Sequence, residues 1–182
     1  TNNDLSFQSA FLACLYAGCV AVPIQIPRHK RNHPDMGLAR HISVIRDADI
    51  KITLLDAAYV ETLKKYQGSI DDVFPGTRVK PIQDILACVE EHSDLDTLPE
   101  PSKLAFLQYT SGSTSDPKGV MLTHECIVEN QNSMKNCYQL SEENTFVSWL
   151  PVYHDMGLCT GLFMPLYLGV KAVMMTPQTF IA

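Results

Sequence analysis

The sequence predicts an α/β fold in which strands and helices alternate around a mainly parallel sheet. Short apolar runs rich in β-branched residues are separated by segments whose apolar residues recur at helical spacing, and this alternation is typical of parallel sheets with crossover helices. With 182 residues, 46% of them hydrophobic, the chain is long enough to bury a core of its own.

The first half of the chain is predicted to hold three helices and two strands. The first helix begins at about residue 4, carries Phe11 and Leu15 one turn apart, and ends before Gly18. Because this helix is apolar nearly all round, we expect it to be buried. Residues 19–24, CVAVPI, predict a strand, and the basic, proline-containing segment 25–37 predicts an exposed loop. A helix is predicted over 38–47, because its apolar residues fall at i, i+4 and i+7. A strand over 50–55 and a helix over 57–66 follow. The first half ends with a turn over 73–79 and a solvated acidic connection over 84–102.

The second half is predicted to hold four strands and two helices. A strand over 103–110 leads into the polar segment 111–119, and a second strand follows over 120–123. Thr123 is placed to cap a helix that runs to about Tyr138. The order is completed by a strand over 145–152, a helix that begins near Asp155 and is interrupted by Pro165, and a strand over 170–175.

Charge, cysteine usage and hydropathy argue against several classes of protein. The formal charge of −6 disfavours nucleic acid as the main partner, since phosphate binding normally needs a concentrated basic face. The six cysteines contain no CxxC pair and form no convergent ligand pattern with the histidines, so no metal site is predicted. The longest apolar run, residues 10–24, is too short to span a bilayer, and no basic segment precedes it as in a signal peptide. We therefore expect a cytoplasmic protein with reduced cysteines and no transmembrane segment.

The segment SGSTSDPKG, residues 111–119, lies where an open α/β sheet would bind phosphate. Ligands of such sheets bind beyond the carboxyl ends of strands, and this segment follows such an end. Glycines and small hydroxyl residues let backbone N–H groups converge on an anion, and Lys118 adds a mobile positive charge. The candidate phosphate-binding residues are Thr110, Ser111, Gly112, Ser113, Thr114, Lys118 and Gly119.

Two better-known loops do not fit this segment. Gly112 and Lys118 have the spacing of a P-loop, but Pro117 replaces its second glycine, Gly119 replaces its magnesium-binding hydroxyl residue, and a strand follows instead of a helix. No serine here has glycine both two residues before and two after it, so the segment is no hydrolase nucleophile elbow. A plain hairpin turn with a solvated lysine stays open as the structural alternative.

Two longer stretches resemble one enzyme superfamily. YTSGSTSDPKGVMLTH, residues 109–124, resembles the phosphate-binding signature of the adenylate-forming superfamily, which includes acyl-CoA ligases, peptide-synthetase adenylation domains and luciferases. SWLPVYHDMGL, residues 148–158, resembles the segment in which that superfamily places an aromatic–histidine pair close to the nucleotide phosphates and the acyl carboxylate. Its form, together with FLACLYAGCVAVPIQIP at 11–27, is similar to fatty acyl-AMP ligases. Ser115 departs from the signature, because many members carry glycine there.

The resemblance implies an ATP-dependent ligase that activates a fatty acid as an acyl-adenylate and releases pyrophosphate. It implies ATP as a substrate, Mg²⁺ to shield the phosphates, and Lys118 and His154 as catalytic residues. From the residues alone, His154 between a strand and a helix could donate a hydrogen bond to an anionic oxygen, or it could be a solvated imidazole beside a capping Asp155. The implied acyl acceptor is an acyl carrier protein or a polyketide synthase, with coenzyme A as the alternative. We expect the apolar segment 156–170 to pack in the core, with an acyl tunnel as the alternative.

The resemblance runs along nearly all of the chain but covers only part of a complete enzyme. None of the seven tyrosines is followed by glycine, so the later Tyr-Gly segment of the superfamily is not found, nor are its ribose-binding aspartate and its small C-terminal domain with a catalytic lysine. We expect residues 1–182 to be a fragment of the large N-terminal AMP-binding (adenylation) domain, inactive by itself. A non-catalytic module with a nucleotide-shaped surface and an interaction fragment of a larger assembly are the competing readings.

Overall fold

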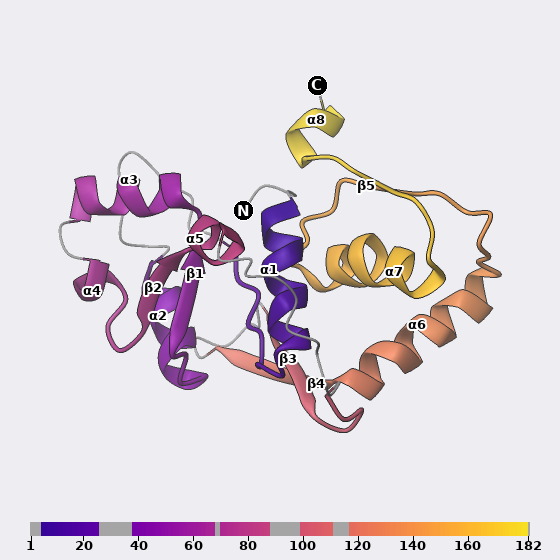
Figure 1. The fold of residues 1–182 in the computed structure, drawn as a ribbon, viewed down its shortest axis with the longest axis horizontal. Coiled ribbons are helices and arrows are strands. Elements are labelled where there is room, and N and C mark those ends of the chain that lie inside the picture. Colours follow the sequence, from indigo (N-terminus) through magenta and orange to yellow (C-terminus); the bar gives the residue numbers. More distant parts are fainter. Residues whose placement is uncertain (1–4, 26–37, 68–69, 88–98, 111–116, 182) are drawn as a thin grey trace. The chain divides into compact units, whose positions relative to one another are not determined.

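The computed structural model describes residues 5–25, 38–67, 70–87, 99–110 and 117–181. These residues form two compact units, each with an apolar core of its own. The first unit takes in Thr1–Gln25, Leu95–Gln108 and Val120–Ala182, and the second takes in Ile26–Asp94 and Tyr109–Gly119. Figure 1 shows their helices and strands, and each unit is described by itself.

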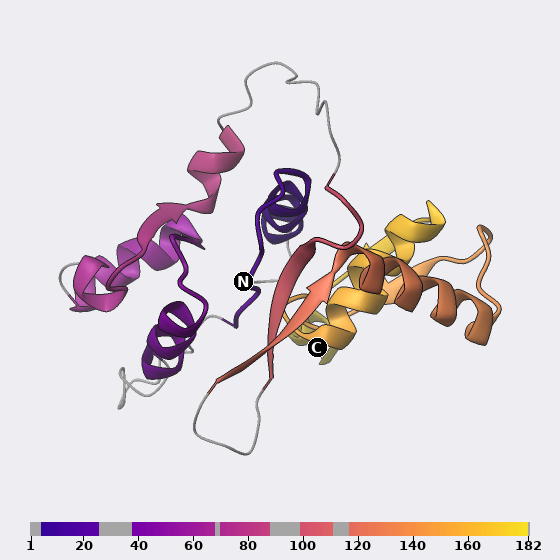
Figure 2. The same cartoon turned by 90° about the horizontal axis from the view of Figure 1, so that it is seen from below.

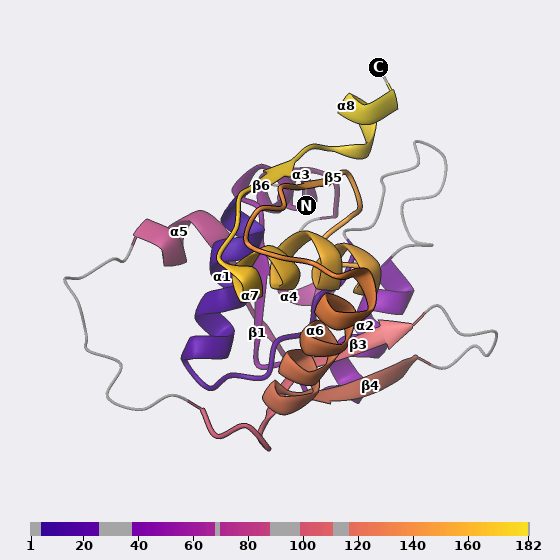
Figure 3. The ribbon, with the colours of Figure 1, turned by 90° about the vertical axis from the view of Figure 1, so that its right-hand side faces the viewer.

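The first unit combines helices with short strands. Its elements, two of which also extend into the second unit, are α1 (Leu5–Tyr16), β3 (Leu104–Thr110), β4 (Lys118–Thr123), α6 (His124–Tyr138), β5 (Phe146–Ser148), the π-helix η1 (Gly157–Phe163), α7 (Met164–Leu168), β6 (Ala172–Met174) and α8 (Pro177–Ile181). The strands β3 and β4 form a two-stranded sheet, and Figure 2 shows α6 continuing directly from β4. The strands β5 and β6 pair in parallel, as Figure 3 shows.

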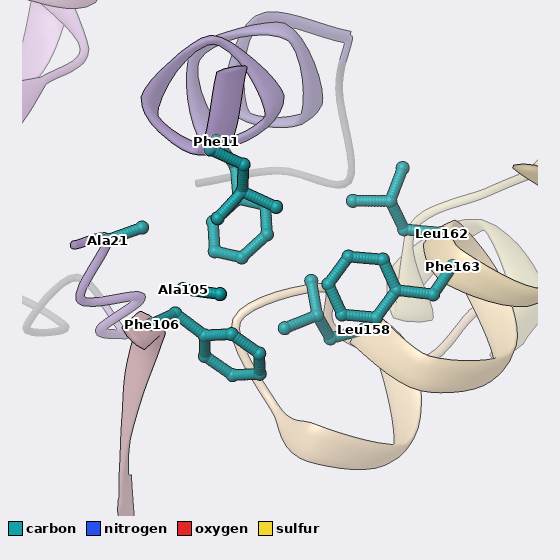
Figure 4. Packing of buried hydrophobic residues seen from close by; sticks show 8 residues of the cluster. Phe11, Ala21, Ala105, Phe106, Leu158, Leu162 and Phe163 are labelled. Atoms are coloured by element: carbon teal, nitrogen blue, oxygen red, sulfur yellow. The ribbon is translucent and has the colours of Figure 1, made fainter. Parts of the chain in front are cut away.

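Three aromatic rings from distant parts of the chain meet in the core of the first unit. Phe11 of α1, Phe106 of β3 and Phe163 of η1 have ring centroids between 5.7 and 6.0 Å apart (Figure 4). Leu158 and Leu162 of η1 are buried in the same cluster. This packing joins the apolar stripe of α1 to the segment that follows the YHD motif, and it confirms that 156–170 supplies core residues.

Two expectations for the N-terminal segment are wrong in part. α1 has the predicted bounds, but Leu5 is 76% and Tyr16 is 53% exposed, so the helix buries one face and not its whole surface. Residues 19–24 do not form a strand; they make an isolated parallel bridge from Ala21 to Phe106. Pro23 lacks an N–H donor, which limits any longer pairing of this segment.

A side-chain cap fixes the start of α6, and the boundaries of three other predicted elements differ from those in the structure. Thr123 Oγ1 accepts a hydrogen bond of 3.1 Å from the Cys126 N–H, which confirms the predicted N-cap. The helix continues through Pro165, where the prediction had an interruption; the structure changes there from π-helix (η1, to Phe163) to α-helix (α7, from Met164) without a break. The predicted strands 145–152 and 170–175 shrink to three residues each, at Phe146–Ser148 and Ala172–Met174.

The second unit is a small α/β unit. Its remaining elements are α2 (Leu38–Asp47), β1 (Ile52–Leu55), α3 (Ala57–Gln67), α4 (Ile70–Val73), β2 (Arg78–Pro81) and α5 (Ile82–Ala87). β1 and β2 pair in parallel, with Ile52 opposite Arg78, and Leu63 and Phe74 are almost fully buried beneath them. β2 falls in the predicted turn and α5 in the predicted acidic connection. The sequences of β2 and α5 show no clear hydrophobic period. Arg78–Pro81 is a strand because it pairs with β1.

The predicted α/β class with parallel strand pairs is confirmed, but the sheet is divided. The described strands pair as three two-stranded sheets and not as one continuous sheet. β1 and β2 belong to the second unit and β5 and β6 to the first, so these pairs complete separate cores.

Candidate functional site

The candidate phosphate-binding segment joins the end of β3 to the start of β4. Thr110 is the last residue of β3 and Lys118 is the first residue of β4, and both side chains are exposed. Ser111, Gly112, Ser113 and Thr114 lie outside the described residues, as does Ser115. Lys118 and Gly119, expected in the loop, are strand residues, because β4 begins two residues earlier than its apolar pattern suggested.

Helix α2 holds the β3 end of this segment through two side chains. Arg40 Nη2 donates a hydrogen bond of 3.0 Å to the carbonyl oxygen of Thr110. The Tyr109 hydroxyl donates a hydrogen bond of 2.5 Å to Asp47 Oδ2. The last two residues of β3 are therefore tied, through one carbonyl and one side chain, to both ends of α2.

The environment of Tyr109 keeps its phenol protonated at neutral pH. Burial, the hydrogen bond to Asp47 and the negative charge of that carboxylate together raise the pKa of Tyr109 to about 12. The hydroxyl is thus a dependable donor to Asp47 across the physiological range. Neither Arg40 nor Asp47 stands out in the sequence, because nothing in the 38–47 pattern marks a residue as a partner of a segment more than 60 positions away.

Gly119 allows a close approach between the two strands at this point. A Cβ at residue 119 would lie 2.9 Å from Cζ and 3.1 Å from Cε2 of the Tyr109 ring. Both distances are shorter than ordinary van der Waals contact, so only glycine leaves the ring where it can reach Asp47. The glycine after Lys118 therefore has a packing reason that the loop signature alone does not reveal.

In the first unit, His154 presents an exposed imidazole on a fixed backbone. Its side chain is 64% exposed, and Nδ1 contacts the Asp155 carboxylate. The His154 N–H donates to the Pro151 carbonyl at 3.0 Å, and the His154 carbonyl accepts from Leu158 N–H at 2.8 Å. Asp155 Oδ1 also accepts from the N–H of the next residue, Met156, at 2.6 Å, but no side-chain cap is formed at the start of η1. The imidazole is thus exposed, with Asp155 beside it, while its backbone is held by two hydrogen bonds.

The π-helix after His154 begins with a glycine pressed against backbone. A Cβ at Gly157 would lie 2.1 Å from the carbonyl oxygen of Pro151, the same oxygen that accepts from His154. Seven residues of π-helix follow, and such segments are frequent at functional sites. The glycine of the YHDMG motif is thus required by the tight turn that carries the histidine.

Trp149, the tryptophan of the same motif, has a packing partner in the described chain. Its ring stacks on Phe180 of α8 with centroids 3.8 Å apart and planes 2° from parallel.

Within the described residues, no group of three or more His, Cys, Asp or Glu side chains could hold a metal ion. In the same part of the chain, no helix is both long and apolar enough to cross a membrane.

A sequence comparison decides the family. The profile of the family described as AMP-binding enzyme matches residues 2–182. The chain belongs to this AMP-binding enzyme family.

Relatives of this AMP-binding chain include two curated fatty acid ligases. A medium-chain-fatty-acid–acyl-carrier-protein ligase of Moorena producens is 35% identical over 184 residues, which cover 97% of this chain and 29% of that protein. A long-chain-fatty-acid–AMP ligase of Mycobacterium marinum is 36% identical over 189 residues, covering 97% of this chain and 30% of that protein. This AMP-binding chain therefore spans about a third of the length of the curated relatives it matches.

Solved structures show the same fold. A fatty acyl-adenylate ligase from L. pneumophila, in complex with acyl adenylate and pyrophosphate, superimposes with a TM-score of 0.80 and 31% identity over 100% of this chain and 30% of that one. The architecture of this AMP-binding chain is thus that of the adenylate-forming N-terminal domain.

Proposed function

We propose that this chain is part of the large N-terminal domain of an ATP-dependent ligase that activates a fatty acid as an acyl-adenylate. Family membership over residues 2–182 supports this proposal, and so does the likeness to a fatty acyl-adenylate ligase that holds acyl adenylate and pyrophosphate. The observation that carries it is the position of two exposed residues, Thr110 and Lys118, at the two ends of one loop. The carbonyl of Thr110 accepts a hydrogen bond from Arg40 of α2.

In the proposed reaction both reactants are anions. A carboxylate oxygen of the fatty acid attacks the α-phosphorus of ATP, the bond from that phosphorus to the oxygen leading to the β-phosphate breaks, and pyrophosphate leaves with the electron pair. The protein therefore has to neutralise negative charge and align the two reactants with donors that are already in place. The chain need not supply a nucleophile for this step.

We assign the phosphate contacts to the loop and its two ends. Lys118 supplies a positive charge from the first position of β4, where the strand limits how far its backbone can move. The other proposed phosphate-binding residues are Thr110, Ser111, Gly112, Ser113, Thr114 and Gly119. His154, with an exposed imidazole, is proposed to donate a hydrogen bond near the reacting carboxylate or α-phosphate.

Magnesium and the acyl acceptor belong to the same proposal. Mg²⁺ would accompany ATP and shield the charge of its phosphates; the described residues contain no cluster of His, Cys, Asp or Glu side chains that could hold the ion by themselves. The acceptor is an acyl carrier protein, alone or within a polyketide synthase, as the name of the Moorena producens relative suggests. Acyl transfer to coenzyme A in place of a carrier protein would contradict this assignment.

Lys118→Ala tests the proposed phosphate contact. In the full-length protein we expect fatty-acid-dependent exchange of labelled pyrophosphate into ATP to fall at least about tenfold, which corresponds to about 1.4 kcal/mol of transition-state stabilisation. The loss follows from removing a cation that faces the developing pyrophosphate charge.

Lys80→Ala is the matched control, since Lys80 is also an exposed strand lysine of the second unit. It should leave the exchange rate unchanged. An unchanged rate for Lys118→Ala would refute the role of this lysine, and a full-length protein without exchange for any fatty acid would refute the ligase itself.

A further inference from the structure

Gln108 of β3 is a buried amide with one carbonyl partner. Its exposed fraction is 8%, and Nε2 donates a hydrogen bond of 3.2 Å to the carbonyl oxygen of Tyr153, 45 positions along the chain. Its Oε1 is buried, and among the described residues it finds no hydrogen-bond partner. Burying an amide oxygen in this way lowers stability, so an apolar residue would serve a purely structural role better.

The carbonyl that Gln108 holds belongs to the peptide group immediately before His154. The nitrogen of this same peptide group, His154 N–H, donates to the Pro151 carbonyl at 3.0 Å. The peptide group is planar, so bonds at its two ends fix the orientation of the whole plane. The bond from the Leu158 N–H to the His154 carbonyl restrains the next peptide plane, and the two planes together set the direction in which the His154 Cα–Cβ bond leaves the backbone. Gln108 supplies the bond on the carbonyl side of the first plane.

The His154 imidazole has little else to position it. Its side chain is 64% exposed and contacts the neighbouring Asp155, which is itself 64% exposed. Packing therefore does not set its place, and the backbone plane does. We propose that Gln108 is a positioning residue for His154, holding the Tyr153–His154 peptide plane so that the imidazole meets the reacting anion. This inference rests on the proposed adenylate-forming function.

The experiment replaces Gln108 in the full-length protein by Leu and by Glu. Gln108→Leu removes the unpartnered Oε1, which is a gain in stability, and the bond from Nε2 to the Tyr153 carbonyl, which is a loss, so the melting temperature should change little. Because the imidazole loses its fixed direction, we expect kcat for pyrophosphate exchange to fall about tenfold or more, with KM for ATP nearly unchanged.

Gln108→Glu keeps the shape of the side chain but donates to the Tyr153 carbonyl only when the carboxyl group is protonated. Burial raises the pKa of such a group, so the activity of the variant relative to the unmodified protein should rise as the pH is lowered. A side chain that merely fills space would show no such pH profile.

Gln131→Leu is the matched control. Gln131 is a glutamine of α6 with 1% exposure and an unpartnered Oε1, and its Nε2 bonds the side chain of Asn130 and not the motif. The same substitution should leave kcat unchanged. If Gln108→Leu keeps the kcat of the unmodified protein, or loses no more activity than Gln131→Leu, the inference is wrong while the ligase proposal stands.

An NMR measurement, which needs no enzymatic turnover, tests the positioning role of Gln108 separately from the ligase proposal. With histidine labelled by ¹³C, the imidazole NMR signals of His154, assigned with His154→Ala, should shift or broaden in Gln108→Leu and stay unchanged in Gln131→Leu. If the unmodified protein shows no pyrophosphate exchange, the ligase proposal fails, and the NMR comparison still decides whether Gln108 positions the imidazole. Unchanged His154 signals in Gln108→Leu would overturn the positioning role.

Discussion

Tyr109 links the candidate phosphate segment to α2 by its hydroxyl, and its ring lies against Gly119 of β4. The hydroxyl donates to Asp47, and the ring occupies the space that a side chain at residue 119 would need. One residue therefore gives a reason for both a carboxylate in α2 and a glycine in β4. Its neighbour Thr110 is bound through its carbonyl to Arg40, and the threonine side chain is exposed.

Tyr109→Phe is expected to lower the free energy of unfolding by about 1 to 2 kcal/mol at neutral pH, because it removes the bond to Asp47. The folded state raises the pKa of this phenol from 10.0 to about 12, so it favours the protonated form. The stabilisation is complete below about pH 10 and is lost as the pH rises towards 12. Denaturant unfolding across this range should show the difference between variant and unmodified protein shrinking.

Tyr138→Phe is the control for that series, because Tyr138 is 67% exposed. It should change stability little at any pH. A difference for Tyr109→Phe that is constant from neutral pH to pH 12 would contradict the bond to Asp47.

At the scale of elements, the segment from β5 to α7 converts a short strand into a continuous helix by way of a tight turn. His154 bonds back to Pro151, Leu158 bonds back to His154, and η1 then buries Leu158 and Leu162 in the core. The turn is possible because Gly157 lies against the Pro151 carbonyl with no side chain between them. The exposed histidine is thus anchored by the buried residues that follow it.

Gly157→Ala is expected to destabilise the protein by about 1 to 3 kcal/mol, because its Cβ would overlap the Pro151 carbonyl oxygen and force the backbone to shift. Pyrophosphate exchange should fall as well, since that oxygen also accepts from His154. Thermal unfolding and exchange kinetics measure the two effects.

Gly161→Ala in the same π-helix is the comparison. A Cβ there would meet the Ser148 side-chain oxygen at 3.2 Å, which is a milder contact with a side-chain atom. Equal losses for the two variants would show that helix chemistry, and not the contact with Pro151, is responsible.

At the scale of the whole molecule, the chain contains two units with separate cores and spans about a third of its curated relatives. Thr110, Lys118 and Gly119 belong to the second unit and His154 to the first.

The 182-residue chain alone is expected to show no fatty-acid-dependent pyrophosphate exchange, whereas the full-length protein should show it. The reason is that the chain spans about a third of its curated relatives' length, and the resemblance implies a ribose-binding aspartate and a catalytic lysine that are not found among residues 1–182. Circular dichroism of the isolated chain is the control for folding. Exchange by the folded chain alone would contradict this expectation.

Local pattern was enough for most of the larger elements and for the family. The bounds of α1, α2, α3 and α6 follow from periodicity and from the stop and cap residues Gly18 and Thr123, which act within one or two turns. The two signatures are contiguous stretches whose chemistry can be read residue by residue. The short elements β2 and α5 could not be predicted, because pairing and packing with distant residues decide a four-residue strand or a six-residue helix.

The sequence by itself determined that small hydroxyl residues, glycines and a lysine lie between two strands, because covalent order puts them there. Only the tertiary structure decided that Arg40 and Asp47 hold the end of β3, and that Gln108 holds the peptide before His154. The physical reason is distance along the chain: these bonds join residues 45 to 70 positions apart, and no local period or propensity encodes which distant group a buried donor will meet.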